Sequence, residues 1–266
     1  MSHSSPCEHC HWFGSGAAFV TAPRTLRRDE PLAVELRSAI QRGDIETLHR
    51  LLHANPGLAC SRIVNPKGGS TSPLHSATDW PGYFPNGPAV VRELLAAGAD
   101  PNARVEGSWH AETPLHWAAS SDDVDVAEAL IDGGADIEAT GASIAGGTPL
   151  DDAVGYGCWR VARLLVQRGA RVEKLWHAAA LGLTVLVERL VAGTPGPTKN
   201  EINDAFWQAC HGGHRRAAQF LLERGADLNW IPDYAKQTPL EIASSTDTGR
   251  SNLIDWLKEQ GAASHL

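Results

Sequence analysis

Residues 112–119 have the sequence ETPLHWAA, and most of this stretch has a simple structural explanation. Thr113 is a good N-cap, and Pro114 suits the first position of a helix. Leu115, Ala118 and Ala119 are spaced to pack against a neighbouring helix. Trp117 does not fit, because it places the largest side chain among small ones. The stretch therefore predicts a short, tightly packed helix with one residue that packing does not explain.

Related segments recur along the chain, and each has an apolar anchor at the place of Leu115. The clearest are SPLHSAT at 72–78, TPLDDAV at 148–154 and TPLEIAS at 238–244. Successive anchors lie 25 to 41 residues apart. Self-similarity at such a period indicates a repeat architecture. The anchors are Leu36, Leu74, Leu115, Leu150, Leu175, Phe206 and Leu240.

An amphipathic stretch follows each anchor. Its apolar residues recur at helical spacing, as at Val124, Ala127, Leu130 and Ile131. A glycine stands where most of these helices should stop. Each unit is thus two short helices and a turn, and neither helix can bury its apolar face alone, so the units must stack. The terminating glycines are Gly98, Gly134, Gly169, Gly225 and Gly261.

These segments resemble the ankyrin repeat, whose signature is T-P-L-H-x-A at a period near 33 residues. The resemblance covers residues 31–262 and implies an all-α solenoid of about seven helix-turn-helix units. We expect residues 31–266 to form this repeat domain and residues 1–30 to be an extension that caps the first repeat. The resemblance also implies a concave groove, lined by first helices and by finger loops, that holds a protein or peptide partner.

Three departures from the family pattern predict irregular fingers in the centre. Between Arg171 and Leu175 there is almost no room for a finger, and residues 192–203 are rich in Pro and Gly. Residues 79–89 instead form a longer loop inside the second unit. Two interpretations stay open: a remodelled binding site, or drift that a tolerant surface loop allows.

The residue two positions after each anchor is usually apolar in this family, and it borders the groove-facing side of the first helix. Here several of these residues are polar or aromatic, namely Ser76, Trp117, Asp152, His177 and Gln208. Large aromatic side chains with a few polar groups suit a binding site. The binding residues that we predict are Trp80, Trp109, His110, Trp117, Tyr156, Gln208 and His211.

Asp152 and His177 support an alternative function. They occupy the same position in adjacent units, and a carboxylate that accepts a bond from an imidazole can make it a general base. The alternative is therefore an atypical small-molecule-binding or catalytic protein that uses these two residues without a metal. The simpler interpretation is a set of solvated polar residues. His75 and His116 fall at the family's own histidine position and are expected to be structural.

Composition bounds the remaining possibilities. The net charge of −8 argues against a nucleic-acid partner, and no apolar run is long enough for a membrane helix. The N-terminus lacks a signal-peptide pattern, which predicts a cytoplasmic protein. Cys7 and Cys10 in CEHCHW are only half of a zinc site, so we expect no metal and no cofactor. Repeat domains of this size are commonly monomeric, and we expect a monomer.

Overall fold

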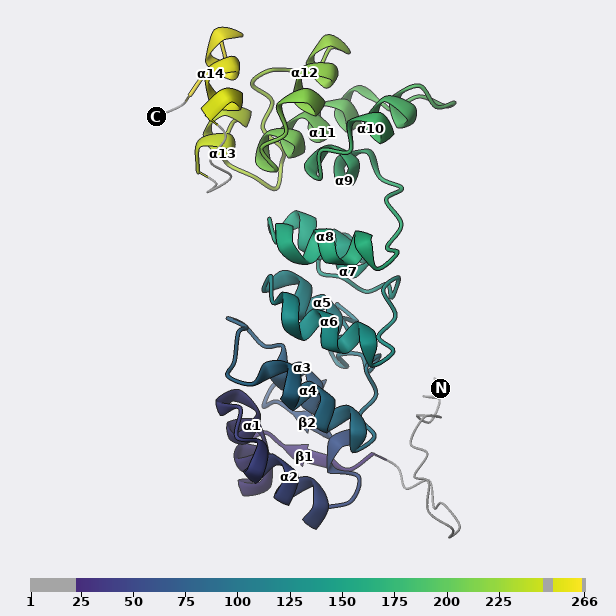
Figure 1. The fold of residues 1–266 in the computed structure, drawn as a ribbon, viewed down its shortest axis with the longest axis vertical. Coiled ribbons are helices and arrows are strands. Elements are labelled where there is room, and N and C mark those ends of the chain that lie inside the picture. The colour runs from purple at the N-terminus through teal and green to yellow at the C-terminus, as the bar shows by residue number, and fades with distance from the viewer. Residues whose placement is uncertain (1–22, 246–250, 265–266) are drawn as a thin grey trace. The chain divides into compact units, whose positions relative to one another are not determined.

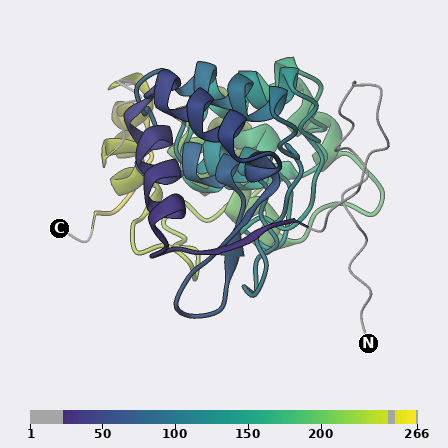
Figure 2. The ribbon, with the colours of Figure 1, turned by 90° about the horizontal axis from the view of Figure 1, so that it is seen from below.

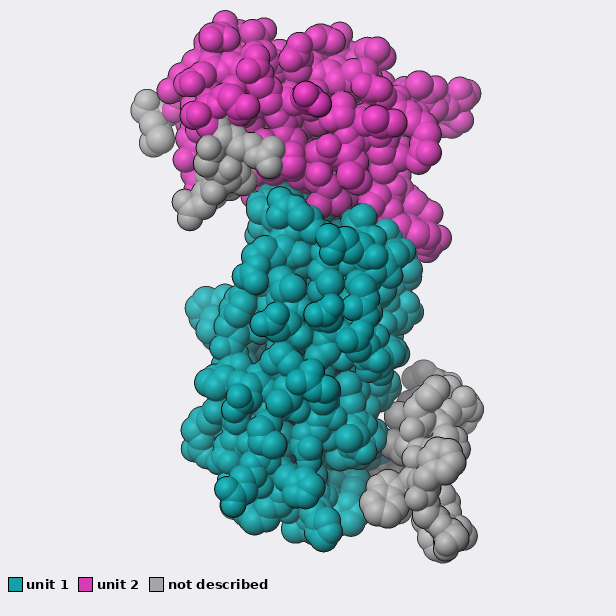
Figure 3. Space-filling model, viewed as in Figure 1, with its two compact units in different colours: residues 1–170 teal, residues 171–266 magenta. Residues whose placement is uncertain are grey.

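A computed structural model of the chain describes residues 23–245 and 251–264. The chain forms two compact units, residues 1–170 and 171–266 (Figure 3). The boundary falls where the sequence leaves almost no room for a finger, between Arg171 and Leu175. Each unit buries its own set of apolar side chains.

Unit 1 is a stack of four helix pairs over the part of the chain that the structure describes (Figure 1). Seen along the stack, its helices lie to one side, and the loops that join successive pairs project to the other (Figure 2). In chain order the helices are α1 (Pro31–Arg42), α2 (Ile45–Ala54), α3 (Pro73–Ala77), α4 (Gly87–Ala96), α5 (Pro114–Ser120), α6 (Val124–Asp132), α7 (Pro149–Gly155) and α8 (Trp159–Gln167).

The helix pair that contains the opening stretch forms for the reasons its sequence suggests. Thr113 is the N-cap of α5, and a capping box joins it to His116. The Asp123 side chain caps α6 by accepting from the Val126 amide. Gly134 follows α6 at a φ of 91°, a conformation that glycine adopts without strain. Local capping and turn chemistry thus set the length of both helices.

A small three-stranded sheet is the only strand structure among the described residues. It contains β1 (Thr25–Arg27), β2 (Arg62–Val64) and β3 (Ser70–Thr71), in the order β1-β2-β3. Strand β1 pairs with β2 in parallel, and β2 pairs with β3 antiparallel. Leu26 is buried on β1 beside the first repeat. Residues 1–22 of the predicted extension lie outside the described residues.

Unit 2 contains three more helix pairs: α9 (Leu175–Ala180), α10 (Thr184–Val191), α11 (Lys199–His211), α12 (Arg215–Glu223), α13 (Pro239–Ser245) and α14 (Ser251–Glu259). Phe206 and Trp207 of α11 lie in its core with Leu221 and Trp256. The predicted fold of about seven helix-turn-helix repeats is confirmed, since seven pairs occur in the described ranges. No helix in those ranges is both long and apolar enough to cross a membrane.

Candidate functional site

Trp117 lines a surface pocket of about 420 Å³ in unit 1. Its walls come from the loop after α3, the finger before α5, helix α5 itself, the loop between α6 and α7, and the residue after α7. Three of the predicted binding residues, Trp80, Trp117 and Tyr156, are brought together here. The lining residues are Thr78, Asp79, Trp80, Glu112, Trp117, Ser120, Ser121, Ser143 and Tyr156.

The half-buried indole of Trp117 is held on two sides. Its Nε1–H donates to Glu112 Oε2 at 3.0 Å. Its ring meets the His75 ring edge-on, with the centroids 4.9 Å apart and the planes at 79°. An aromatic pair in this geometry is attractive beyond the area that it buries. Trp117 is therefore a fixed wall of the pocket, oriented by a contact with the preceding repeat and by one with the residue before its own helix cap.

Glu112 connects two sides of the pocket, and our sequence analysis did not select it. One carboxylate oxygen accepts from Trp117, and the other accepts from the Ser143 amide at 3.2 Å. Its position directly before Thr113, within reach of a tryptophan on the next helix, was the available signal. The bond to Ser143 joins residues 31 apart in the chain, and no local pattern reveals it.

Asp152 lies behind the pocket and is fully buried. Its Oδ1 accepts from Ser143 Oγ at 2.9 Å and from the Ile144 amide at 3.1 Å, whereas Oδ2 is buried without a hydrogen-bond partner. Burial raises the pKa of this carboxyl to about 7, and the nearby charges of Glu112 and Asp151 act in the same direction. Asp152 therefore changes charge near neutral pH.

The Ser143 hydroxyl links the buried carboxyl of Asp152 to the pocket surface. This hydroxyl also lies 3.0 Å from the hydroxyl of Tyr156, which is half exposed at the rim. The chain Asp152–Ser143–Tyr156 thus runs from the core to solvent. Its contacts hold both pocket-lining hydroxyls in place.

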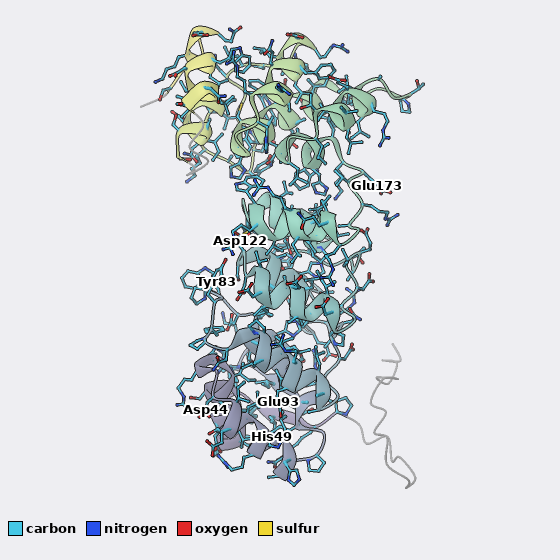
Figure 4. All side chains as sticks on the ribbon, in the orientation of Figure 1. Asp44, His49, Tyr83, Glu93, Asp122 and Glu173 are labelled. Carbon is cyan, nitrogen blue, oxygen red and sulfur yellow. The ribbon has the colours of Figure 1, made fainter. Side chains whose placement is uncertain are left out.

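The loop that carries Trp80 is pinned to the two following repeats. The Tyr83 amide donates to Asp123 Oδ2 at 2.7 Å, and the Tyr83 hydroxyl donates to the Asp122 carbonyl. Arg160 Nη1 donates to the same hydroxyl at 3.1 Å. Figure 4 shows Tyr83 and Asp122 on the same side of unit 1. The extra loop of the second repeat is therefore an anchored structure.

Gly82 allows this loop to lie close to its neighbour. It has a φ of +76°, and a Cβ placed there would come 3.0 Å from the Ser121 Cβ. A side chain at this position would meet both backbone strain and a tight contact. Even so, the Trp80 side chain is 80% exposed. A rigid loop thus presents a large apolar ring to solvent at the pocket edge.

Trp109 and His110, both predicted to bind, lie elsewhere in unit 1. They belong to the finger before α5, and their rings lie 3.5 Å apart between centroids with the planes tilted by 39°. Trp109 is 90% exposed, and neither residue lines the pocket. Their role in binding stays a prediction of the sequence, and a docking site at the pocket does not include them.

Gln208 and His211 lie on α11 in unit 2, in a hydrogen-bonded polar cluster. The buried Gln208 donates to the Tyr234 hydroxyl at 3.1 Å, and that hydroxyl donates to Asp204. Burial lowers the pKa of His211 to about 4, so its imidazole is neutral at physiological pH. The Trp207 ring lies 5.2 Å from that of His211. The polar groups of Gln208, Tyr234 and Asp204 therefore form hydrogen bonds within this cluster.

The proposed pair of Asp152 and His177 is divided between the units. Asp152 belongs to α7 in unit 1, and His177 belongs to α9 in unit 2, where it is buried beside Trp176. Their pairing stays a prediction. The placement of this helix position at the groove border needs correction, because Ser76, Asp152 and His177 are buried between helices, and only Trp117 is half exposed.

The histidines of the repeat signature have structural contacts. His116 Nδ1 accepts from the Thr113 amide at 3.0 Å, which places its proton on Nε2. His75 makes the same contact with Ser72 at 3.2 Å. Burial lowers the pKa of His116 to about 4 and that of His75 to about 3. Both are neutral imidazoles that cap their own helices.

No group of three or more metal-binding side chains occurs in residues 23–245 and 251–264. Cys7 and Cys10, which the sequence analysis weighed as half of a zinc site, lie outside these ranges. The described part of the chain therefore contains no candidate metal centre.

Comparisons with known proteins agree with the repeat architecture of the helix pairs. A family model for ankyrin repeats matches three times, over residues 36–140, 74–174 and 175–265. The ankyrin repeat and KH domain-containing protein mask-1 of Caenorhabditis elegans is 32% identical over 154 residues, which are 58% of this chain but 5% of that protein. The human ASB11 ankyrin repeat domain has a similar fold, with a TM-score of 0.50 and 19% identity over 85% of this chain and 96% of that one.

Proposed function

We propose that this chain, which belongs to the ankyrin repeat family, is a binding module whose pocket in unit 1 holds a protein or peptide partner. Ankyrin repeat domains are generally protein-interaction modules. The pocket adds a place for that interaction, with Trp80, Trp117 and Tyr156 as aromatic anchors. Binding energy at protein interfaces is concentrated in such anchors.

The exposure of Trp80 on an anchored loop is the observation that carries this proposal. The indole is 80% exposed, although Tyr83 in the same loop bonds to two following repeats. A fixed loop loses little conformational entropy when a partner covers it. The apolar area already exposed would then be buried against the partner. Both effects favour association at this edge.

The pocket volume favours one second candidate, a small-molecule ligand. About 420 Å³ lies within the range of ligand sites, and the hydroxyls of Ser143 and Tyr156 could orient a ligand. The peptide function fits better, because Trp80 and Tyr156 leave the pocket open at its rim.

A selection experiment with a matched pair of variants tests the proposal. Peptides from a random phage-displayed library are selected against the full chain, and their affinities are measured by fluorescence anisotropy. Trp80→Ala should weaken binding at least about tenfold, since anchor residues contribute about 2 kcal/mol or more. Trp109→Ala is the control, because it removes an equally exposed indole that does not line the pocket.

Equal affinities of the wild-type chain and Trp80→Ala for the selected peptides would contradict the proposal. A larger loss from Trp109→Ala than from Trp80→Ala would contradict it as well, because the docking site would then be the finger before α5. Circular dichroism of both variants shows whether the fold is kept.

A further inference from the structure

The pocket is acidic and contains no basic side chain. Asp79 and Glu112 contribute carboxylates to its lining, and none of the lining residues is Lys, Arg or His. Arg37 on α1 lies close enough to Asp79 to interact with its charge, but Arg37 does not line the pocket. The carboxylates therefore face the pocket without a neutralising partner in its walls.

Asp152 strengthens this negative character from behind. Its Oδ2 is buried without a hydrogen-bond partner, and the charges of Glu112 and Asp151 act on it unfavourably. Glu112 and Asp151 thus each lie close enough to Asp152 to disfavour its charged form. A positive charge in the pocket would stabilise the carboxylate of Glu112 and the charged form of Asp152, because low-dielectric surroundings strengthen such interactions.

The aromatic rings of the pocket have faces that no basic side chain of the described residues covers. Four rings elsewhere lie beside a basic side chain of this protein, as Tyr83 does beside Arg160 at 5.9 Å. The other three pairs are Lys174 with Trp176, Arg215 with Trp256, and Arg224 with Phe220. Among the described residues, no such cation lies over Trp80, Trp117 or Tyr156. Their electron-rich faces are open to a cation from another molecule.

We propose that the pocket recognises a lysine or arginine side chain of the partner, with the cationic group placed between the carboxylates of Asp79 and Glu112 and the faces of Trp80 and Trp117. This inference rests on the proposed docking site and specifies the chemistry of its partner. The rings and the carboxylates contribute differently to this recognition. The rings bind the apolar stem and the cation, and the carboxylates supply charge and hydrogen-bond acceptors.

A pair of small probes separates charge from shape. The lysine probe is N-acetyl-lysine methylamide, and the matched neutral probe is N-acetyl-norleucine methylamide. Titration is followed through the tryptophan indole N–H signals in proton–nitrogen correlation spectra of the full chain. The lysine probe should shift the Trp80 and Trp117 signals saturably, and the norleucine probe should bind at least tenfold more weakly. Higher salt should weaken binding of the lysine probe.

Charge-neutral variants test the two carboxylates. Asp79→Asn combined with Glu112→Gln should lower the affinity for the lysine probe at least tenfold. Asp79→Asn alone should lower it less, and it leaves the bond between Trp117 and Glu112 in place. Asp255→Asn is the control, because it removes one exposed carboxylate from α14 in unit 2.

Three outcomes would overturn the inference: equal binding of both probes, no binding of the lysine probe, or unchanged binding by the folded double variant. The selected peptides separate this failure from failure of the docking site. If Trp80→Ala weakens peptide binding but replacing each basic peptide residue by norleucine does not, the docking site stands and cation recognition is wrong.

Discussion

The two units use aromatic side chains on their first helices in opposite ways. In unit 1, Trp117 is half exposed and borders a pocket. In unit 2, Trp207 is 4% exposed and donates its indole N–H to the Gln237 carbonyl at 2.9 Å. The ring of Tyr234 then meets Trp207 edge-on, with a centroid distance of 5.9 Å. One unit leaves space beside its indole, and the other fills it.

Two features differ between these repeats. The first is the helix position, because Trp117 lies two residues after its anchor Leu115 and Trp207 one residue after Phe206. The second is the loop that follows each repeat. In unit 2 the loop before α13 places Tyr234 beside Gln208, whose side-chain amide donates to the Tyr234 hydroxyl. In unit 1 the corresponding loop places Ser143 at the pocket, and this small residue donates hydrogen bonds to Glu112 and Asp152. The small side chain leaves a pocket that the long loop around Trp80 extends. Helix position and connecting loop together therefore decide which repeats present a site.

Replacing one tryptophan of each unit by alanine, Trp207 in unit 2 and Trp80 in unit 1, should give the largest difference in stability. Trp207→Ala removes a buried ring from the core of unit 2 and should lower the free energy of unfolding by about 3–5 kcal/mol. Trp80→Ala removes an exposed ring and should change it by less than about 0.5 kcal/mol. Urea denaturation followed by circular dichroism measures both. Similar losses from the two variants would mean that Trp80 is a structural residue.

Asp152→Asn should change how stability depends on pH. The folded-state pKa is about 7 and the ordinary value is 3.8, so between these values the folded chain holds a proton that the unfolded chain has lost. This carboxyl therefore reduces stability as pH rises from about 4 to 7, by a total on the order of 4 kcal/mol. The variant lacks this loss, and its stability relative to wild type should increase over that interval.

Thermal unfolding at a series of pH values measures this difference. His75 and His116 act in the opposite direction, because their lowered pKa values make stability fall as pH drops below about 6.5. Their effect is common to both proteins and cancels. A constant difference between wild type and variant from pH 4 to 8 would show that Asp152 is already ionised at pH 4. Asp255→Asn serves as the control.

Removing the hydroxyl of Tyr234 or of Tyr156 should give the smallest difference in stability between the two units. Tyr234→Phe removes a bond to Asp204 and one from Gln208, and should cost about 1–2 kcal/mol of stability. Tyr156→Phe removes a contact with Ser143 at the exposed rim and should cost less than about 0.5 kcal/mol. If Tyr156→Phe cost as much as Tyr234→Phe in urea denaturation, the single contact of Tyr156 would be worth as much as the two hydrogen bonds of Tyr234.

The fold could be predicted from the sequence because its determinants are local. Thr113, Pro114 and the glycine after most second helices act within one repeat, and their recurrence reveals the stack. The split at residue 170 was not predicted, although it lies beside the short finger before Leu175. The small sheet was not foreseen, since β1 and β2 pair across 37 positions of sequence.

The site was only partly predictable, because its geometry depends on loops. Of the seven predicted binding residues, Trp80, Trp117 and Tyr156 line one pocket, and their role in binding stays a prediction. Helical spacing alone did not show that Asp152 is buried, since that depends on how the finger carrying Ser143 folds over it. Glu112 was missed for the same reason. Periodicity places residues on a helix face, but it does not show what covers that face.

The most direct test of the docking site observes its tryptophans during binding. The chain is labelled with 5-fluorotryptophan, each fluorine signal is assigned by single Trp→Phe substitution, and a peptide selected against the full chain is added. The account predicts that the Trp80 and Trp117 signals shift in proportion to bound peptide, while those of Trp109 and Trp207 stay in place. Shifts at Trp109 or Trp207, with Trp80 and Trp117 unmoved, would contradict it.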